Sequence, residues 1–305
     1  MVPSLVGVTL VVFLMLRLIP GTVVEQMLGL EALATKETVE SLRRFFGLDQ
    51  PIHAQYAEWA RQVVAGDLGR SWRTGQPVAQ LIWSRLPVTL ELTLLSILVS
   101  IALGVATGIV SALRQGTLLD NLTRLGSLFG LSIPVFWQGT MLILLLSFYF
   151  GWAPPLDWVD PFREPGTNFK MMALPALCLG TASAATVMRM SRATLLDVLR
   201  QDYIRTAHAK GASQRGVVAG HALKNAMIPV ITVVGLQVGT LLGGAVVVEE
   251  VFTLPGVGRL ILQAIYARDY PVVQGTVLFI AVLFMVTNLI VDVCYAVLDP
   301  RIRYG

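Results

Sequence analysis

Residues 225–248 read NAMIPVITVVGLQVGTLLGGAVVV, a run without aspartate, glutamate, lysine or arginine. An apolar run of about 18 residues or more is long enough to cross a bilayer as a helix. Gly235, Gly239 and Gly243 recur in this run at four-residue spacing. That spacing places them on one helix face, where another helix can approach closely. The run therefore predicts a transmembrane helix with a packing face.

Four further charge-free runs occupy residues 92–113, 125–156, 171–188 and 270–291. In the run 125–156, Pro134 is expected to break or kink the start of the helix and Pro154-Pro155 to end it. The crossing in this run is therefore expected near 133–151. Together with 225–248, these runs predict five crossings.

Residues 1–16 are also charge-free and would suit the core of a signal peptide as well as a helix. Because no basic region precedes them and no cleavage site of small residues follows, we expect a first transmembrane helix. The missing basic flank suggests that the native N-terminus was trimmed.

The composition agrees with a membrane protein. Of the 305 residues, 55% are hydrophobic and only 14% are charged, against roughly 25% charged residues in soluble domains. The net charge of +4 is expected to report orientation in the membrane rather than binding to nucleic acid. Cys178 and Cys294 lie inside apolar runs and are expected to be small buried hydrophobes.

The basic residues predict the orientation. Loops 114–124 and 189–224, with the tail 299–303, hold eleven basic and four acidic residues. The opposite loops hold ten basic and thirteen acidic residues, at 21–84, 157–170 and 249–269. Because basic loops stay in the cytoplasm, we expect six helices with both termini on that side. Within 21–84, helical spacing at 38–46 and 54–64 predicts a small helical cap, with a turn at 47–51.

Motifs that indicate catalysis or the binding of phosphate or metal are few in this sequence. No phosphate-binding Gly-x-x-x-x-Gly-Lys-Ser/Thr and no His-Glu-x-x-His occurs. A membrane-embedded enzyme using His208, His221 and nearby acids would need those groups to converge in a buried pocket, which their basic surroundings do not favour. A carrier coupled to an ion gradient would be expected to place acidic residues at mid-membrane, and none is evident in the runs.

The most specific patterns are VEEVFTLPGVGRL at 248–260, ARDYPVVQG at 267–275 and RTAHAKGA at 205–212. Shorter ones are LDQP at 48–51, GDLGRS at 66–71 and LDPRIR at 298–303. Together they resemble the B-type permease subunits of dipeptide and oligopeptide ABC importers, over nearly the whole chain from residue 10. Several motifs are typical of the branch that carries peptides, nickel and glutathione.

The resemblance implies a function and a set of partners. The chain would be a non-catalytic subunit in the bacterial inner membrane, forming half of a translocation path for a di- or oligopeptide by ATP-driven alternating access. Its partners would be a homologous C-type permease, two cytoplasmic ATPases that hold ATP and Mg, a periplasmic solute-binding protein and lipid. This chain would bind no cofactor. Nickel chelates, glutathione and opines remain alternative cargoes.

The resemblance also implies a division of the chain. Residues 1–20 would be the first helix, 21–85 a periplasmic helical loop, and 86–305 a five-helix core with a cytoplasmic coupling loop at 190–224. In that loop, the segment 202–222 would seat on an ATPase as the coupling helix. Its small residues would permit close seating, and its charges would meet the rim of the groove. The coupling residues would be Asp202, Arg205, Thr206, Ala207, Ala209, Lys210 and Gly211.

Two details of this segment are notable. Gly211 is expected to turn the chain after a short helix. Where the widespread importer motif has Glu-Ala-Ala, this chain has Arg205-Thr206-Ala207, so the ATPase surface that meets Arg205 is expected to compensate, for example with acidic residues.

Two further groups complete the candidate sites. Helix packing or the pathway is assigned to Gly235, Gly239, Gly243 and Gln237, whereas the pair Gly104 and Gly108 is a weaker signal because single pairs arise by chance. The polar residues Gln138, Ser183, Thr186 and Asn225 either line the pathway or bond between helices. The periplasmic loop group, taken from the family motifs, comprises Glu249, Phe252, Pro255, Gly256, Gly258 and Asp269.

Overall fold

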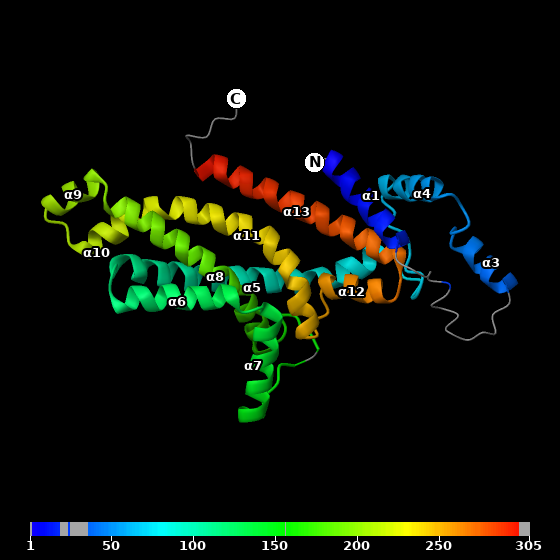
Figure 1. Ribbon diagram of the computed structural model, residues 1–305, viewed down its shortest axis with the longest axis horizontal. Coiled ribbons are helices and arrows are strands. Elements are labelled where there is room, and N and C mark those ends of the chain that lie inside the picture. Colours follow the sequence, from blue (N-terminus) through cyan, green and yellow to red (C-terminus); the bar gives the residue numbers. More distant parts are fainter. Residues whose placement is uncertain (1, 19–23, 25–35, 156, 299–305) are drawn as a thin grey trace. The chain divides into compact units, whose positions relative to one another are not determined.

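The computed structural model describes residues 2–18, 24, 36–155 and 157–298, and most of them lie in helices (Figure 1). Within these ranges no β-strand occurs, although Arg70 and Pro77 form an isolated bridge. The expected all-α class is therefore confirmed. Most of the C-terminal motif 298–303 and of the segment 19–35 lies outside the described residues.

Two units divide the chain. Unit 1 comprises Met1–Pro87 and Gly256–Met285, and unit 2 comprises Val88–Pro255 and Val286–Gly305. Residues far apart in the sequence thus join one unit.

Unit 1 contains the predicted cap helices. Its elements are α1 (Val2–Leu18), α3 (Lys36–Phe45), α4 (Ile52–Val64), α12 (Val257–Tyr266) and the first parts of α5 (Val78–Leu113) and α13 (Tyr270–Leu298). The helical spacing at 38–46 and 54–64 is confirmed by α3 and α4, and Gly47 (φ 65°) lies in the turn between them. The core of this unit is built from Leu16, Val78, Ile82, Leu260, Ala264, Tyr270, Val272 and Val273.

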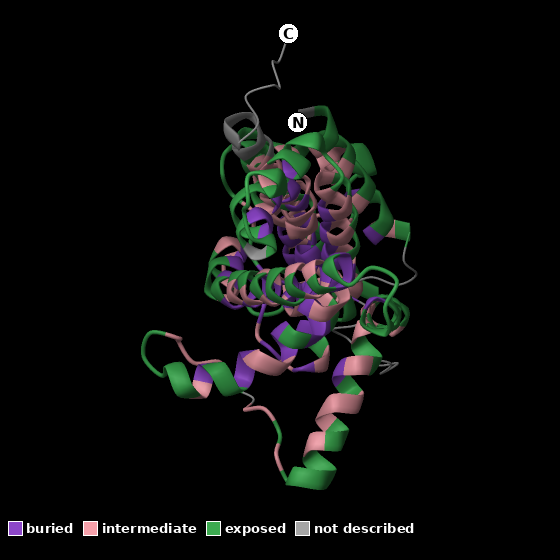
Figure 2. Cartoon of the chain, turned by 90° about the vertical axis from the view of Figure 1, so that its left-hand side faces the viewer, coloured by how far each residue is buried: buried purple, intermediate pink, exposed green. Residues whose placement is uncertain are grey.

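Unit 2 is a helical bundle around α8. After the second part of α5 come α6 (Leu118–Ser132), α7 (Val135–Phe150), α8 (Pro165–Leu199), α9 (Asp202–Ala209), α10 (Gln214–Val217), a π-helical turn (Val218–Ala222) and α11 (Leu223–Val251). α8 packs against α6, α7 and α11, and the last stretch of α13 also belongs to this unit. Many apolar side chains of the bundle are exposed, among them Leu94, Leu98, Leu144, Phe148 and Leu236. Figure 2 shows buried and exposed positions alternating along individual helices, as expected where apolar faces meet lipid or another chain.

Within the described ranges, four helices are long and apolar enough to cross a membrane: Val78–Leu113, Pro165–Leu199, Val218–Val251 and Tyr270–Val291. α6 and α7 form a pair bent by 100°, which counts as a fifth span if the two cross together. The bend lies at Pro134, as predicted, because proline cannot donate a helix hydrogen bond and restricts the residue before it. α1 is a shorter apolar helix, so the expected count of six crossings stays a prediction.

Candidate functional site

The basic segment 202–222 is divided at Gly211. α9 ends in a left-handed turn, where Gly211 has φ +83°. The Gly211 N–H donates to the His208 carbonyl (2.9 Å) and the Ala212 N–H to the Ala207 carbonyl (3.2 Å). This paired pattern is the Schellman motif, which glycine adopts without a steric penalty. The predicted turn after a short helix is present, and the chain resumes in α10 and the π-helical turn.

α9 has one face toward its own bundle. Ile204 is 2% exposed and packs in a cluster with Leu195, Ala222 and Ala226, against which Ala207 also lies. On α11, the Asn225 amide Nδ2 donates a 2.9 Å hydrogen bond to the Tyr203 hydroxyl. A small apolar contact and one hydrogen bond thus hold α9 to the bundle.

The other face of α9 is open. Arg205 and Asp202 form a pair at 3.5 Å, with 79% and 95% of their side chains exposed. Four further members of the predicted coupling group are also exposed, namely Thr206, Ala209, Lys210 and Gly211. This face offers charge and small side chains, which suit a groove on a soluble partner.

The glycines of α11 have different neighbours. A Cβ added to Gly235 would lie 2.6 Å from Cγ1 of Val291 on α13, whereas Gly243 has nothing within 4 Å. Gly239 is buried. The Gln237 amide Nε2 donates to the Ser183 carbonyl on α8 at 3.1 Å. Gly235 and Gln237 therefore make helix contacts, and a part in the pathway stays a prediction for this group.

Gly104 and Gly108, the glycine pair that the sequence ranked lower, also lie at a close helix contact in unit 2. A Cβ on Gly104 would lie 2.6 Å from Val187 Cβ, and one on Gly108 would lie 2.6 Å from Ser191 Cβ. On α8, a Cβ added to Gly180 would lie 2.7 Å from the Ser96 carbonyl oxygen. Because each added atom would collide, these glycines let α5 and α8 cross backbone against backbone.

In unit 2, two members of the predicted periplasmic loop group lie at the end of α11. Glu249 lies in the last turns of the helix and has no exposed surface. Its Oε1 accepts a 2.6 Å hydrogen bond from the Thr89 hydroxyl on α5. Phe252 follows the helix and packs at Gly139 of α7, where an added Cβ would lie 2.8 Å from the ring. Pro255, also in this group, is half-buried.

Three members of that group lie in unit 1. Gly256 caps the start of α12, and Gly258 is buried within its first turn. Asp269 is 4% exposed. Its carboxylate accepts hydrogen bonds from the Ser71 hydroxyl (2.5 Å) and from the backbone N–H of Trp72 (3.0 Å). The carboxylate thereby fixes the loop 70–75 to the start of α13.

One cluster that the sequence did not single out joins Ser111, Asp120 and Arg192. The Asp120 carboxylate accepts from Nε and Nη2 of Arg192 (2.9 Å each) and from the Ser111 hydroxyl (2.6 Å). The Gly116 N–H donates to the same carboxylate at 3.0 Å. Sequence reasoning used these charges only to count basic and acidic loops, although an aspartate in the first turn of a helix is a signal for local hydrogen bonding.

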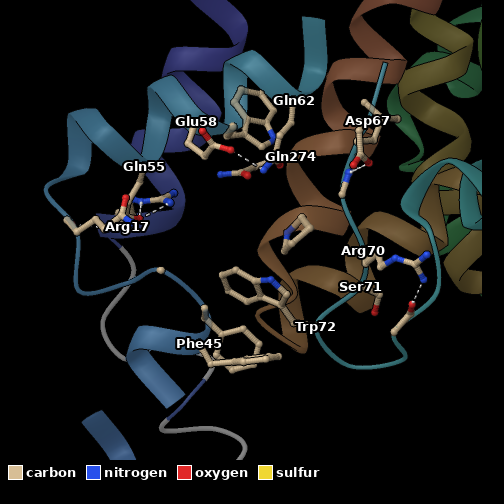
Figure 3. Close-up of a pocket in the computed structure, with 18 residues that line it drawn as sticks. Arg17, Phe45, Gln55, Glu58, Gln62, Asp67, Arg70, Ser71, Trp72 and Gln274 are labelled. Atoms are coloured by element: carbon tan, nitrogen blue, oxygen red, sulfur yellow. Dashed lines mark hydrogen bonds between the residues drawn. The ribbon is translucent and has the colours of Figure 1, made fainter. Parts of the chain in front are cut away.

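Unit 1 contains a cavity of about 680 Å³. It is walled by α3, α4, the loop 67–75 and the start of α13 (Figure 3). Its aromatic lining comes from Phe45, Phe46, Trp59 and Trp72.

The charged groups of this cavity already have partners. Arg17 donates to Gln55 Oε1 at 2.7 and 3.0 Å and lies over the Phe13 ring. Glu58 pairs with Arg61 at 2.8 Å, and hydrogen bonds from Arg61 and from Gln62 hold the pKa of Glu58 below its usual value.

Among the described residues, no group of three or more His, Cys, Asp and Glu side chains could hold a metal. His208 and His221 are both exposed. The buried pocket that an enzyme would need is not formed around them.

Comparison with known proteins decides the family. Residues 104–304 match the model of the "Binding-protein-dependent transport system inner membrane component", and residues 2–93 match the corresponding N-terminal model. The chain belongs to this family. It is a permease component of a binding-protein-dependent importer of the ABC class, and the resemblance found in the motifs is confirmed.

Similar proteins cover the full length. The chain is 42% identical to the di/tripeptide transport system permease protein DppB of Pseudomonas aeruginosa, over 100% of this chain and 96% of that protein. It is 38% identical to the dipeptide transport system permease protein DppB of Escherichia coli, over 99% and 96%.

Solved structures support the fold. An inward-facing form of the MetNI methionine ABC transporter matches 72% of this chain and 97% of its own, with a TM-score of 0.59 and 18% identity. An amino acid ABC transporter with histidines matches 73% and 95%, with a TM-score of 0.54 and 16% identity.

Proposed function

We propose that this permease component imports di- and oligopeptides and forms one half of their path across a bacterial inner membrane. The single observation that supports this choice of cargo is the similarity to di/tripeptide and dipeptide permeases over nearly the full length of both chains. That similarity includes the stretches in which the peptide-branch motifs lie.

In this proposal the chain crosses the membrane six times. α1 and the bent pair α6–α7 supply the two crossings beyond the four long apolar helices. The excess of basic residues in 114–124, 189–224 and 299–303 supports cytoplasmic termini. The cap of α3 and α4 then lies on the periplasmic side, within reach of a solute-binding protein.

Energy would enter through α9. Its exposed face carries the charges and small side chains that suit a partner groove, and its opposite face is attached to the bundle that contains α8 and α11. A pair of cytoplasmic ATPases would bind ATP and Mg, and a C-type permease would complete the path. This chain would bind no cofactor and perform no covalent chemistry.

The experiment is reconstitution of the complex. The chain is co-expressed with its C-type permease and ATPases, purified, and placed in proteoliposomes with a binding protein loaded with radiolabelled dialanine. Uptake is expected only with ATP and Mg on the ATPase side. Uptake by this chain alone, or a purified chain that retains no ATPase, would refute the proposal. Stronger competition by glutathione or a nickel chelate than by unlabelled peptide would overturn the choice of cargo.

A further inference from the structure

Asp120 lies at the start of α6, and neighbouring groups donate hydrogen bonds to every acceptor position of its carboxylate. Its carboxylate accepts four hydrogen bonds: two from the Arg192 guanidinium, one from Ser111 and one from the Gly116 backbone. Arg192 Nε also lies 2.9 Å from the Ser111 hydroxyl. Because a carboxylate has about four acceptor positions, each one is used. The side-on contact of a planar guanidinium fixes both distance and angle.

The carboxylate of this ion pair is buried and its guanidinium is partly buried. The side chain of Asp120 is 2% exposed and that of Arg192 is 22% exposed. Removing one partner of such a pair leaves an uncompensated charge, whereas replacing both partners by apolar residues of similar size is often tolerated. The pair is therefore better suited to fixing an arrangement of helices than to adding stability.

Three helices meet at this pair. Ser111 lies near the end of α5, Asp120 in the first turn of α6, and Arg192 on α8. One turn away, α5 and α8 cross with Gly108 against Ser191, where an added Cβ would lie 2.6 Å from the Ser191 Cβ. A hydrogen-bonded pair beside a backbone contact leaves little freedom for the helices to slide.

The same end of α8 leads to α9. Arg192 lies seven positions before Leu199, where α8 ends, and α9 begins at Asp202. Leu195 on this stretch and Ala112 beside Ser111 share one apolar cluster with Ile204 of α9. The ion pair and the seat of α9 are thus adjacent parts of one packed region.

We propose that Asp120 and Arg192 are positioning residues for energy coupling. They hold the ends of α5, α6 and α8 as one block, so that a displacement of α9 by an ATPase moves these helices together. The inference rests on the proposed coupling role of α9. Without the pair, α9 would still bind the ATPase. However, α8 would slide against α5 and α6, so the displacement of α9 would not be transmitted to them.

The test uses the complete transporter in proteoliposomes with three variants. Asp120→Asn keeps the shape but removes the charge, Arg192→Lys keeps the charge but removes the planar fork, and Asp120→Leu with Arg192→Met replaces the pair by apolar side chains. Thr140→Val is the control, since the exposed Thr140 hydroxyl donates to the Phe136 carbonyl within its own helix, α7. Each sample is measured for co-purified ATPase, thermal stability, dialanine uptake per ATP hydrolysed, and stimulation of ATP hydrolysis by loaded binding protein.

We expect the single variants to retain ATPase at the wild-type ratio while uptake per ATP falls about tenfold. The apolar double variant should recover thermal stability but not the uptake per ATP. Thr140→Val should match the wild type. The idea is overturned if uptake and hydrolysis fall in equal proportion, or if the double variant restores both stability and coupling.

Different results would contradict the proposed function itself. A wild-type complex that carries no ATPase, or whose hydrolysis drives no dialanine uptake, contradicts the function itself. Stimulation of hydrolysis by the binding protein does not depend on which cargo is carried, so it still reports on the ion pair if only the choice of cargo is wrong.

Discussion

The hydroxyl of Thr89 on α5 donates a 2.6 Å hydrogen bond to Oε1 of Glu249 on α11. Both side chains are buried, at 5% and 0% exposure. The sequence placed Glu249 in an outer loop because the charge-free run ends at residue 248. The helix continues to Val251, because a carboxylate with a hydrogen-bond donor from a neighbouring helix can be accommodated inside a bundle.

Thr89→Val should destabilise the protein by about 1–3 kcal/mol, because the isosteric change leaves the buried Glu249 carboxylate with one donor fewer. Thermal unfolding in detergent measures the loss. Thr140→Val is the matched control. The Thr140 hydroxyl is exposed and donates to the Phe136 carbonyl within the same helix, α7. Equal shifts for the two variants would contradict the prediction.

Gly104→Ala should also destabilise, by about 1–3 kcal/mol, because the methyl group would force α5 away from α8. The added Cβ would lie 2.6 Å from Val187 Cβ and 2.8 Å from the Ala184 carbonyl oxygen. At Gly126 on α6 nothing lies within 4 Å, so Gly126→Ala should be neutral or stabilising by up to about 1 kcal/mol. The melting temperatures of the two variants should therefore move in different directions or by clearly different amounts.

Gly211→Ala should weaken the association of this chain with the ATPase. A side chain at φ +83° costs about 1–2 kcal/mol, which corresponds to a roughly fivefold or larger loss in population of the turn that ends α9. The amount of ATPase that co-purifies measures it. Gly211→Asn should retain more ATPase than Gly211→Ala, because asparagine tolerates this conformation better. The reverse order would count against the role of the turn.

Arg205→Glu should reduce ATPase association and uptake while leaving the fold intact. Arg205 is 79% exposed and its pair with Asp202 is long, so the pair itself adds little to stability. Arg61→Glu makes the same change at a side chain 76% exposed on α4 and should leave association unchanged. Unaltered ATP-dependent uptake by Arg205→Glu would show that this charge does not meet the partner.

The sequence predicted the helices well where one local signal was enough. Apolar runs located α8, α11 and α13, and single residues such as Pro134 and Gly211 correctly marked a bend and a turn. It could not rank the glycine contacts, because whether Gly104 or Gly243 meets another backbone depends on which helix lies opposite.

The pairing of Asp120 with Arg192 was also beyond local reasoning. The two residues are 72 positions apart, and a hydrophobicity pattern assigns both simply to basic loops. Periodicity likewise ended α11 at the first acidic residue, since a pattern contains no information on the Thr89 hydroxyl that stabilises Glu249.

The sparse anchoring of α9 has a dynamic consequence. A helix of eight residues with one fully buried side chain, Ile204, detaches at a small fraction of the cost of global unfolding. Its amide protons should therefore exchange with deuterated solvent far sooner than those of α8 or α11, and should become protected when a nucleotide-bound ATPase docks. In the proposed mechanism, such weak anchoring would let α9 return to its starting position in every cycle of transport.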